Sequence, residues 1–148
     1  MKIRKILVPT DLSPEGERAF PAVAELALQS HAAVLLLHVV ENPSLSSAGA
    51  GPFPLHMLPG TVQEVQRVQE LLEQRRGSFP KGVEVSVEAL VAPSVPQAIA
   101  HHAQRNDCDL IALSSHGRSG FRRLVLGSVA EAVLRHSPVP VLVFPRQE

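Results

Sequence analysis

The residues between Ser114 and Ser128 are of the types that bind phosphate. Gly117 and Gly127 have nine residues between them, a serine stands at each end of the stretch, and three arginines lie inside it. Glycine allows backbone amides to approach phosphate oxygens, because it has no Cβ in the way. Gly127 precedes a helical pattern, and the free N–H groups and dipole at the start of a helix favour an anion. This stretch therefore predicts a phosphate-binding loop rather than a catalytic site.

A regular alternation of strands and helices must position this loop. Short apolar runs predict strands at residues 2–8, 33–40, 83–87, 110–113 and 139–144. Helical spacing and capping patterns predict helices that start at Ser13, Thr61, Ser94 and Ser128. The alternation is typical of one α/β domain over residues 1–148. We expect an open five-stranded parallel sheet, Rossmann-like, with the order 3-2-1-4-5 and helices on both faces.

The strand order decides where a ligand would bind. In such a sheet, ligands bind beyond the carboxyl ends of the strands, at the point between the first and fourth strands where the order reverses. Pro9, Thr10 and Asp11 follow the first strand, and the run from Ser114 to Gly117 follows the fourth. We therefore expect these two segments to face each other across a crevice.

Three other segments carry structural signals of their own. Pro21 falls inside the first helical pattern and is expected to kink that helix, because proline removes a donor and crowds the preceding turn. Residues 41–60 are rich in Pro, Ser, Gly and Ala, which predicts a flexible loop. The last strand, from Val139 to Phe144, contains Pro140 and is expected at a sheet edge. Such an apolar edge tends to aggregate unless it is covered, and pairing with its copy in a two-fold homodimer would cover it.

Composition excludes several classes of protein. Acidic and basic residues number 14 each, and Trp and Tyr are absent. Neither net charge nor aromatic stacking would hold a nucleic acid, and no apolar run approaches the roughly 20 residues that span a bilayer. Cys108 is the single cysteine, which excludes an internal disulfide and is typical of a reducing compartment. We expect a cytoplasmic protein that binds neither nucleic acid nor membrane.

The phosphate-binding loop resembles the nucleotide loop of the universal stress protein family, whose ATP-binding members carry Gly-x2-Gly-x9-Gly-[Ser/Thr]. Gly117, the nine-residue spacing, Gly127 and Ser128 match this pattern, whereas Ser114 replaces its first glycine. The resemblance covers the whole chain. It includes the segments Pro9-Thr10-Asp11, Leu37-His38-Val39 and Ser137-Pro138-Val139-Pro140-Val141.

The resemblance implies that the chain binds ATP, with Mg²⁺, and forms a homodimer. Asp11 would contact the ribose or the adenine edge, the Val39 backbone would read adenine, and Leu113 would pack beside the base. The phosphates would be held by Gly117, Gly127, Ser128 and the Val129 amide. Arg118 is the best of the three arginines for a further contact, because it adjoins Gly117. The replacement at Ser114 adds a side chain where the family usually has none.

Several of these assignments have a simpler alternative. Ser128-Val129-Ala130-Glu131 is a capping-box pattern, so Ser128 could serve only to cap a helix. Asp11 could be a turn residue, and the three arginines could be a solvated loop surface. His38 is expected in the core and His116 as a loop donor. The histidines at 101 and 102 and Cys108 lack the spacing of a metal site.

The predicted function is that of a nucleotide-dependent regulatory or stress-protection protein with an unidentified protein partner. No evident catalytic base accompanies the loop, so an enzyme is disfavoured, although slow ATP hydrolysis stays open. The chain lacks the Walker phosphate loop, the dinucleotide-binding glycine fingerprint and the loops of the related α-hydrolases. The alternative is a nucleotide-independent dimeric interaction module of the same fold, which Ser114 favours.

Overall fold

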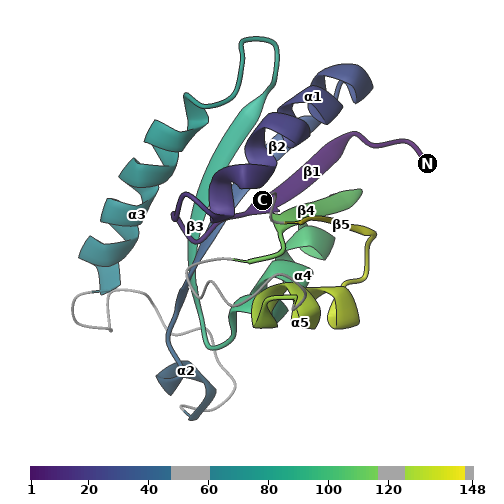
Figure 1. Ribbon diagram of the computed structural model, residues 1–148. Helices are drawn as coiled ribbons and strands as arrows, with labels where there is room; N and C mark the ends of the chain where they lie inside the picture. Colours follow the sequence, from purple (N-terminus) through teal and green to yellow (C-terminus); the bar gives the residue numbers. More distant parts are fainter. Residues whose placement is uncertain (48–60, 117–125, 146–148) are drawn as a thin grey trace.

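The computed structural model describes residues 1–47, 61–116 and 126–145, and a parallel sheet of five strands forms its centre (Figure 1). The strands are β1 (Lys5–Pro9), β2 (Ala33–Glu41), β3 (Val85–Ala92), β4 (Leu110–Ser114) and β5 (Val141–Phe144). Their order in the sheet is β3-β2-β1-β4-β5, which confirms the expected topology. The order reverses between β1 and β4, as expected for a sheet of this kind.

The central strands are apolar over most of their length because both of their faces are covered. Leu7 of β1 is aligned with Leu35 of β2 on one side and with Ile111 of β4 on the other. Leu7 and Ile111 have no exposed surface, and Leu35 is 4% exposed. β3 and β5 lie at the two edges, where burial is less complete.

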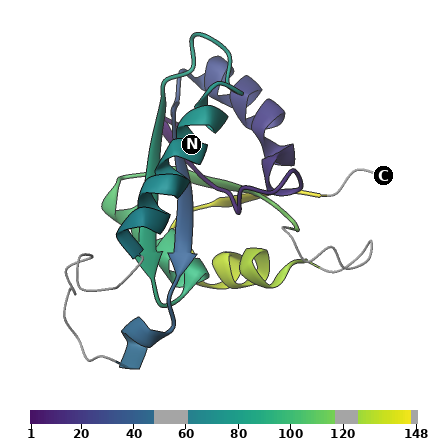
Figure 2. The ribbon, with the colours of Figure 1, turned by 90° about the vertical axis from the view of Figure 1, so that its left-hand side faces the viewer.

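Helices cover both faces of the sheet, as Figure 2 shows from the side. α1 (Phe20–Ser30) and α3 (Thr61–Arg76) pack on one face through residues such as Val23, Val68 and Leu72. α4 (Val95–Arg105) and α5 (Ser128–His136) pack on the opposite face through Ile99, Ala103 and Val133. Within the described residues, no helix is both long enough and apolar enough to cross a membrane.

The chain between β1 and α1 differs from the expected kinked helix. A short 3-10 helix, η1 (Gly16–Ala19), comes first, and α1 begins only at Phe20. Pro21 is therefore the second residue of α1, where an N–H group has no partner within the helix. The predicted kink at Pro21 is wrong because the proline lies in the first turn and not in the helix interior.

Smaller differences concern the edge strands and the loop after β2. β3 starts two residues later than expected and runs on to Ala92, and β5 starts at Val141, just after Pro140. β2 extends to Glu41, and a single-turn helix, α2 (Ser44–Ser47), occupies part of the expected loop. The rest of that expected loop, residues 48–60, lies outside the described residues.

Candidate functional site

A cleft of about 440 Å³ opens beyond the carboxyl ends of β1, β2 and β4, next to the start of α5. This volume falls within the range that small-molecule sites usually have, about 300–1,000 Å³. The residues predicted for the site that line the cleft are Pro9, Thr10, Asp11, Val39, Leu113, Ser114, Gly127, Ser128 and Val129. The other two, Gly117 and Arg118, lie outside the described residues. Segments that are about 100 residues apart in the sequence thus meet at the switch point of the sheet.

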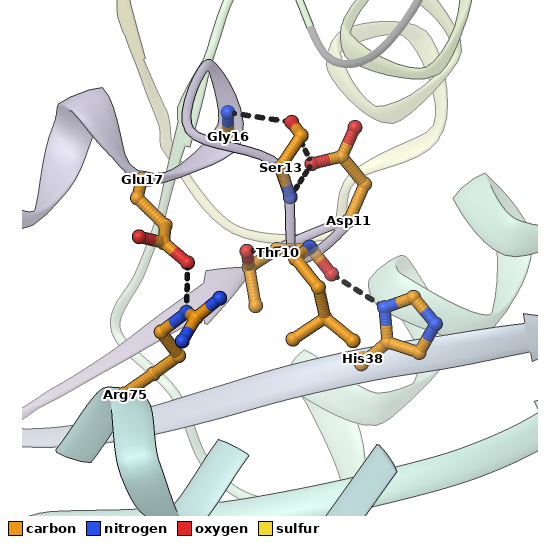
Figure 3. Close-up of polar contacts among 8 residues, drawn as sticks. Thr10, Asp11, Ser13, Gly16, Glu17, His38 and Arg75 are labelled. Carbon is orange, nitrogen blue, oxygen red and sulfur yellow. Dashed lines mark hydrogen bonds and ion pairs between the residues drawn. The ribbon is translucent and has the colours of Figure 1, made fainter. Parts of the chain in front are cut away.

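A tight turn after β1 holds the carboxylate of Asp11 (Figure 3). Oδ1 of Asp11 accepts hydrogen bonds from the backbone amide of Ser13, over 3.0 Å, and from the Ser13 hydroxyl, over 2.5 Å. The hydroxyl oxygen of Ser13 in turn accepts a bond of 3.1 Å from the amide of Gly16. Leu12, in the middle of the turn, has a left-handed backbone with φ of 65°. Asp11 therefore serves as a turn residue, the simpler of its two interpretations, and its side chain also borders the cleft.

Gly16 allows this turn to close against Asp11. A Cβ atom at position 16 would lie 2.4 Å from Oδ1 of Asp11, so any larger residue would push the carboxylate away. The carbonyl of Gly16 accepts a hydrogen bond of 3.2 Å from the hydroxyl of Ser114, at the end of β4. Ser114 is partly buried, and its hydroxyl is directed at this carbonyl.

An ion pair ties the same turn to the helix layer behind it (Figure 3). Nε of Arg75, on α3, donates to the carboxylate of Glu17, in η1. Both side chains are about two-thirds to three-quarters buried, so solvent screens this pair less than an exposed one. The turn that carries Asp11 is thus anchored to α3 as well as to β4.

Gly127 forms the N-cap of α5 and approaches the end of β4 closely. Its amide donates to the carbonyl of Ser115 over 2.8 Å, and a Cβ atom at position 127 would lie 2.7 Å from that carbonyl oxygen. The first bond of the helix runs from the amide of Glu131 to the carbonyl of Gly127, over 2.9 Å. The amides of the three residues in between, Ser128 to Ala130, have no i−4 carbonyl within the helix. These amides lie at the end of α5 that borders the cleft, where the helix dipole favours an anion.

The capping-box interpretation of Ser128 is wrong. Gly127 occupies the N-cap position, and no side chain forms a capping hydrogen bond at the start of α5. Ser128 is the first residue of the helix itself and is exposed at the cleft. A capping side chain must come from the residue before the first helical turn, and here the helix starts one residue earlier than that pattern requires.

The described wall of the cleft carries no lysine or arginine. Its acidic residues are Asp11 and Glu41, and it also contains His38 and His116. An anion near α5 would therefore be held, among the residues the structure describes, by backbone amides and the helix dipole. The part of the wall near Val39, Leu113, Val95 and Ile99 is apolar and suits a flat ring system.

Comparison with known proteins agrees with this geometry. The sequence model of the universal stress protein family matches residues 2–145. The chain belongs to the universal stress protein family. A universal stress protein of Methanocaldococcus jannaschii, MJ0531, is 31% identical over 152 aligned residues, which cover 98% of this chain and 85% of the relative.

Solved structures of the universal stress protein family share the fold. The structure of protein MJ0577, from the same archaeon, is 27% identical and superposes with a TM-score of 0.75. The match covers 100% of this chain and 99% of that protein. UspA from Lactobacillus plantarum is 22% identical, also with a TM-score of 0.75, over 97% of this chain and 99% of its own. At that identity the second comparison shows the fold alone.

The cleft also contains polar residues to which the sequence assigned no ligand contact. Ser115 and His116 lie at the crevice, as expected, whereas His38 and Glu41 were not expected there. His38, which was expected in the core, is partly buried and belongs to the residues that line the cleft, and its Nδ1 donates to the Thr10 carbonyl. Ser115 and His116 lie at the end of β4, with the Ser115 hydroxyl 2.9 Å from Nδ1 of His116. Within the described residues, Nε2 of His116 is buried and has no hydrogen-bond partner. The sequence signal for Ser115 and His116 is their position directly after β4, whereas His38 lies within β2 and has no such signal.

A metal site built from protein ligands has no support in the described part of the chain. No group of three or more histidine, cysteine or acidic side chains comes together in residues 1–47, 61–116 and 126–145. Mg²⁺ typically binds through one or two carboxylates together with phosphates and water. A Mg²⁺ ion would therefore fit this site together with a bound phosphate.

Proposed function

We propose that this universal stress protein binds ATP with Mg²⁺ in the cleft and acts as a nucleotide-dependent regulatory or stress-protection protein in the cytoplasm. The proposal rests on one observation, which is that the turn after β1, the end of β2 and the start of α5 line the same cleft. Its two ends differ in chemistry, and each matches a different part of a nucleotide.

The adenine would lie in the apolar part of the cleft. Val39, Leu113 and Ile99 are all at least 93% buried, and all three line the cleft. They form an apolar wall against which a base could pack. Asp11 and the backbone of Val39 would supply the polar contacts that orient the base and ribose. This division of the cleft into an apolar and a polar part is common in nucleotide sites.

The phosphates would lie against the start of α5. Gly127 presents no side chain there, and the amides of Ser128 and Val129 precede the first bond of the helix. Gly117 and Arg118, which lie outside the described residues, are proposed to complete the phosphate contacts. Mg²⁺ would be bound by the phosphates rather than by a cluster of protein ligands.

Known complexes of proteins with this fold are compatible with the proposal. One universal stress protein was solved in complex with cAMP and another, from Archaeoglobus fulgidus, in complex with dAMP. These two proteins are 18% and 21% identical to this chain, so the argument for ATP here rests on the chain's own cleft. A homodimer through β5 is proposed as well, because Leu142 on that edge strand is 37% exposed.

Calorimetry with ATP and Mg²⁺ tests the nucleotide proposal. The native chain should bind ATP and should bind GTP more weakly, whereas Gly127→Ala should bind ATP at least tenfold more weakly, because its methyl group would displace the Ser115 carbonyl that faces Gly127. Gly77→Ala is the matched control, since Gly77 lies beyond the far end of α3 and does not border the cleft. Absence of ATP binding to the native chain would contradict the proposal and favour the nucleotide-independent dimeric module.

A further inference from the structure

Ser114 stands where β4 ends and where the family's motif usually has glycine. Its hydroxyl donates to the carbonyl of Gly16 over 3.2 Å, which joins two segments that lie 98 residues apart in the sequence. A glycine at position 114 has no hydroxyl and could not form this bond. The replacement thus adds a specific contact at the switch point between β1 and β4.

Gly16 also lies next to the carboxylate of Asp11. The glycine lies so close to the Asp11 carboxylate that a Cβ atom would come within 2.4 Å of Oδ1. If Gly16 moved toward the carboxylate of Asp11, it would displace it. If Gly16 moved away, the carboxylate would have room to change its orientation. Holding the carbonyl of Gly16 in place therefore limits where the carboxylate can lie.

Ser13 connects the same two residues by hydrogen bonds. Its hydroxyl accepts from the amide of Gly16, over 3.1 Å, and donates to Oδ1 of Asp11, over 2.5 Å. The amide of Ser13 donates to the same carboxylate oxygen over 3.0 Å. A continuous series of hydrogen bonds and one close contact thus runs from Ser114 through Gly16 and Ser13 to Asp11.

We propose that Ser114 is a positioning residue of the nucleotide site, which fixes the orientation of the Asp11 carboxylate through Gly16 and Ser13. The inference rests on the proposed function, because it assigns Ser114 a role toward the nucleotide that Asp11 would contact. In this chain the serine adds to the turn a hydrogen bond that a glycine at the same position could not form.

Amide chemical shifts of the ligand-free protein test the structural part of this inference. The amide proton of Ser13 bonds to Asp11, and the amide of Gly16 bonds to Ser13, so both resonances report on the turn. Ser114→Ala should shift both resonances, and Ser114→Thr, which retains a hydroxyl, should restore them. Ser30→Ala is the matched control, because Ser30 also donates to a backbone carbonyl, that of Leu26, but lies away from the cleft. Unchanged resonances in Ser114→Ala would overturn the inference.

ATP affinity in single and double variants tests the functional part. Ser114→Ala should weaken ATP binding about fivefold in the native background, the loss expected for one hydrogen bond, and Ser114→Thr should recover most of it. In an Asp11→Ala background, the same change at Ser114 should alter affinity less than about twofold, because the group it positions is gone. Equal losses in the two backgrounds would overturn the inference while leaving the nucleotide proposal intact. A native chain that does not bind ATP would overturn both.

Discussion

The ring of His38 is fixed by the backbone of Thr10. Nδ1 lies 2.7 Å from the Thr10 carbonyl, and because a carbonyl oxygen can only accept, Nδ1 must carry a proton. His38 lies within β2 and Thr10 directly follows β1, so this bond joins the two strands near their carboxyl ends.

Substitution of His38 should show how much this bond stabilises the fold. His38→Asn places an amide nitrogen near the position of Nδ1, so it should retain most of the stability. His38→Leu removes the donor to Thr10 and should lower the free energy of unfolding by about 1 kcal/mol or more relative to His38→Asn. Urea unfolding of the three proteins measures the difference, and equal stability of the two variants would contradict this account of the bond.

Asp109 should make stability depend on pH at the acidic end. The backbone amide of Arg4, at 2.8 Å, is the main cause that lowers the pKa of Asp109 below its ordinary value, and the Lys5 amide, at 3.1 Å, adds to it. A carboxyl group whose pKa is lower in the folded than in the unfolded state stabilises the fold fully above the unfolded pKa, about 3.9. That stabilisation is lost as pH falls from about 5 toward the folded pKa.

The measurement compares urea unfolding at pH 6 and pH 3. The native chain should lose more stability over this interval than Asp109→Asn, which cannot titrate. Asp107→Asn is the matched control, because within the described residues the side chain of this neighbouring aspartate forms no hydrogen bond. The same pH dependence in the native chain and in Asp109→Asn would refute the linkage.

Cys108 should react with thiol reagents only when the protein opens. The residue is 4% exposed, and burial raises the pKa of its thiol, so little thiolate forms near neutral pH. Labelling by a coloured disulfide reagent at pH 8 should be at least about a hundredfold slower in the folded protein than in urea. Rapid stoichiometric labelling without denaturant would show that the helix α4 side of the core opens easily.

The proposed dimer predicts an effect of a single charge on β5. Leu142→Asp places a carboxylate on the exposed side of this edge strand and should shift sedimentation toward the monomer at micromolar concentration. Leu28→Asp is the control, because Leu28 is 42% exposed on α1, in the helix layer that packs on the other face of the sheet from α4 and α5. A native chain that sediments as a stable monomer would rule out the dimer.

The backbone arrangement was predictable from sequence because it follows from the spacing of apolar residues and from the order of strands and helices along the chain. Apolar runs alternating with helical patterns predicted the order β3-β2-β1-β4-β5, and this order predicted that the turn after β1 would meet the end of β4. The family was also predictable, because Gly127 and Ser128 with their spacing carry its motif. These signals are local in the sequence and need no side-chain geometry.

Features that depend on the exact residue at which a helix begins, or on how distant loops pack, were not predictable. Pro21 looked like an interior proline, because the pattern does not show that a 3-10 turn precedes α1. Ser128 matched a capping box, but the helix begins at that residue and not after it. Likewise, the sequence does not show that Ser114 would meet Gly16, since the bond depends on how two distant loops are packed.

The two edges of the sheet differ in one respect that bears on how copies can assemble. On β3, the side-chain amide of Gln69 donates to the carbonyl of Val87 over 3.3 Å, and Glu88 adds an exposed charge. Within the described residues no strand or side-chain donor covers β5 in the same way. In the proposed dimer through β5, β3 would form each outer edge of the joined sheet. The Gln69 bond and the charge of Glu88 would then oppose pairing of a further copy with β3, which would favour a closed pair over a fibre.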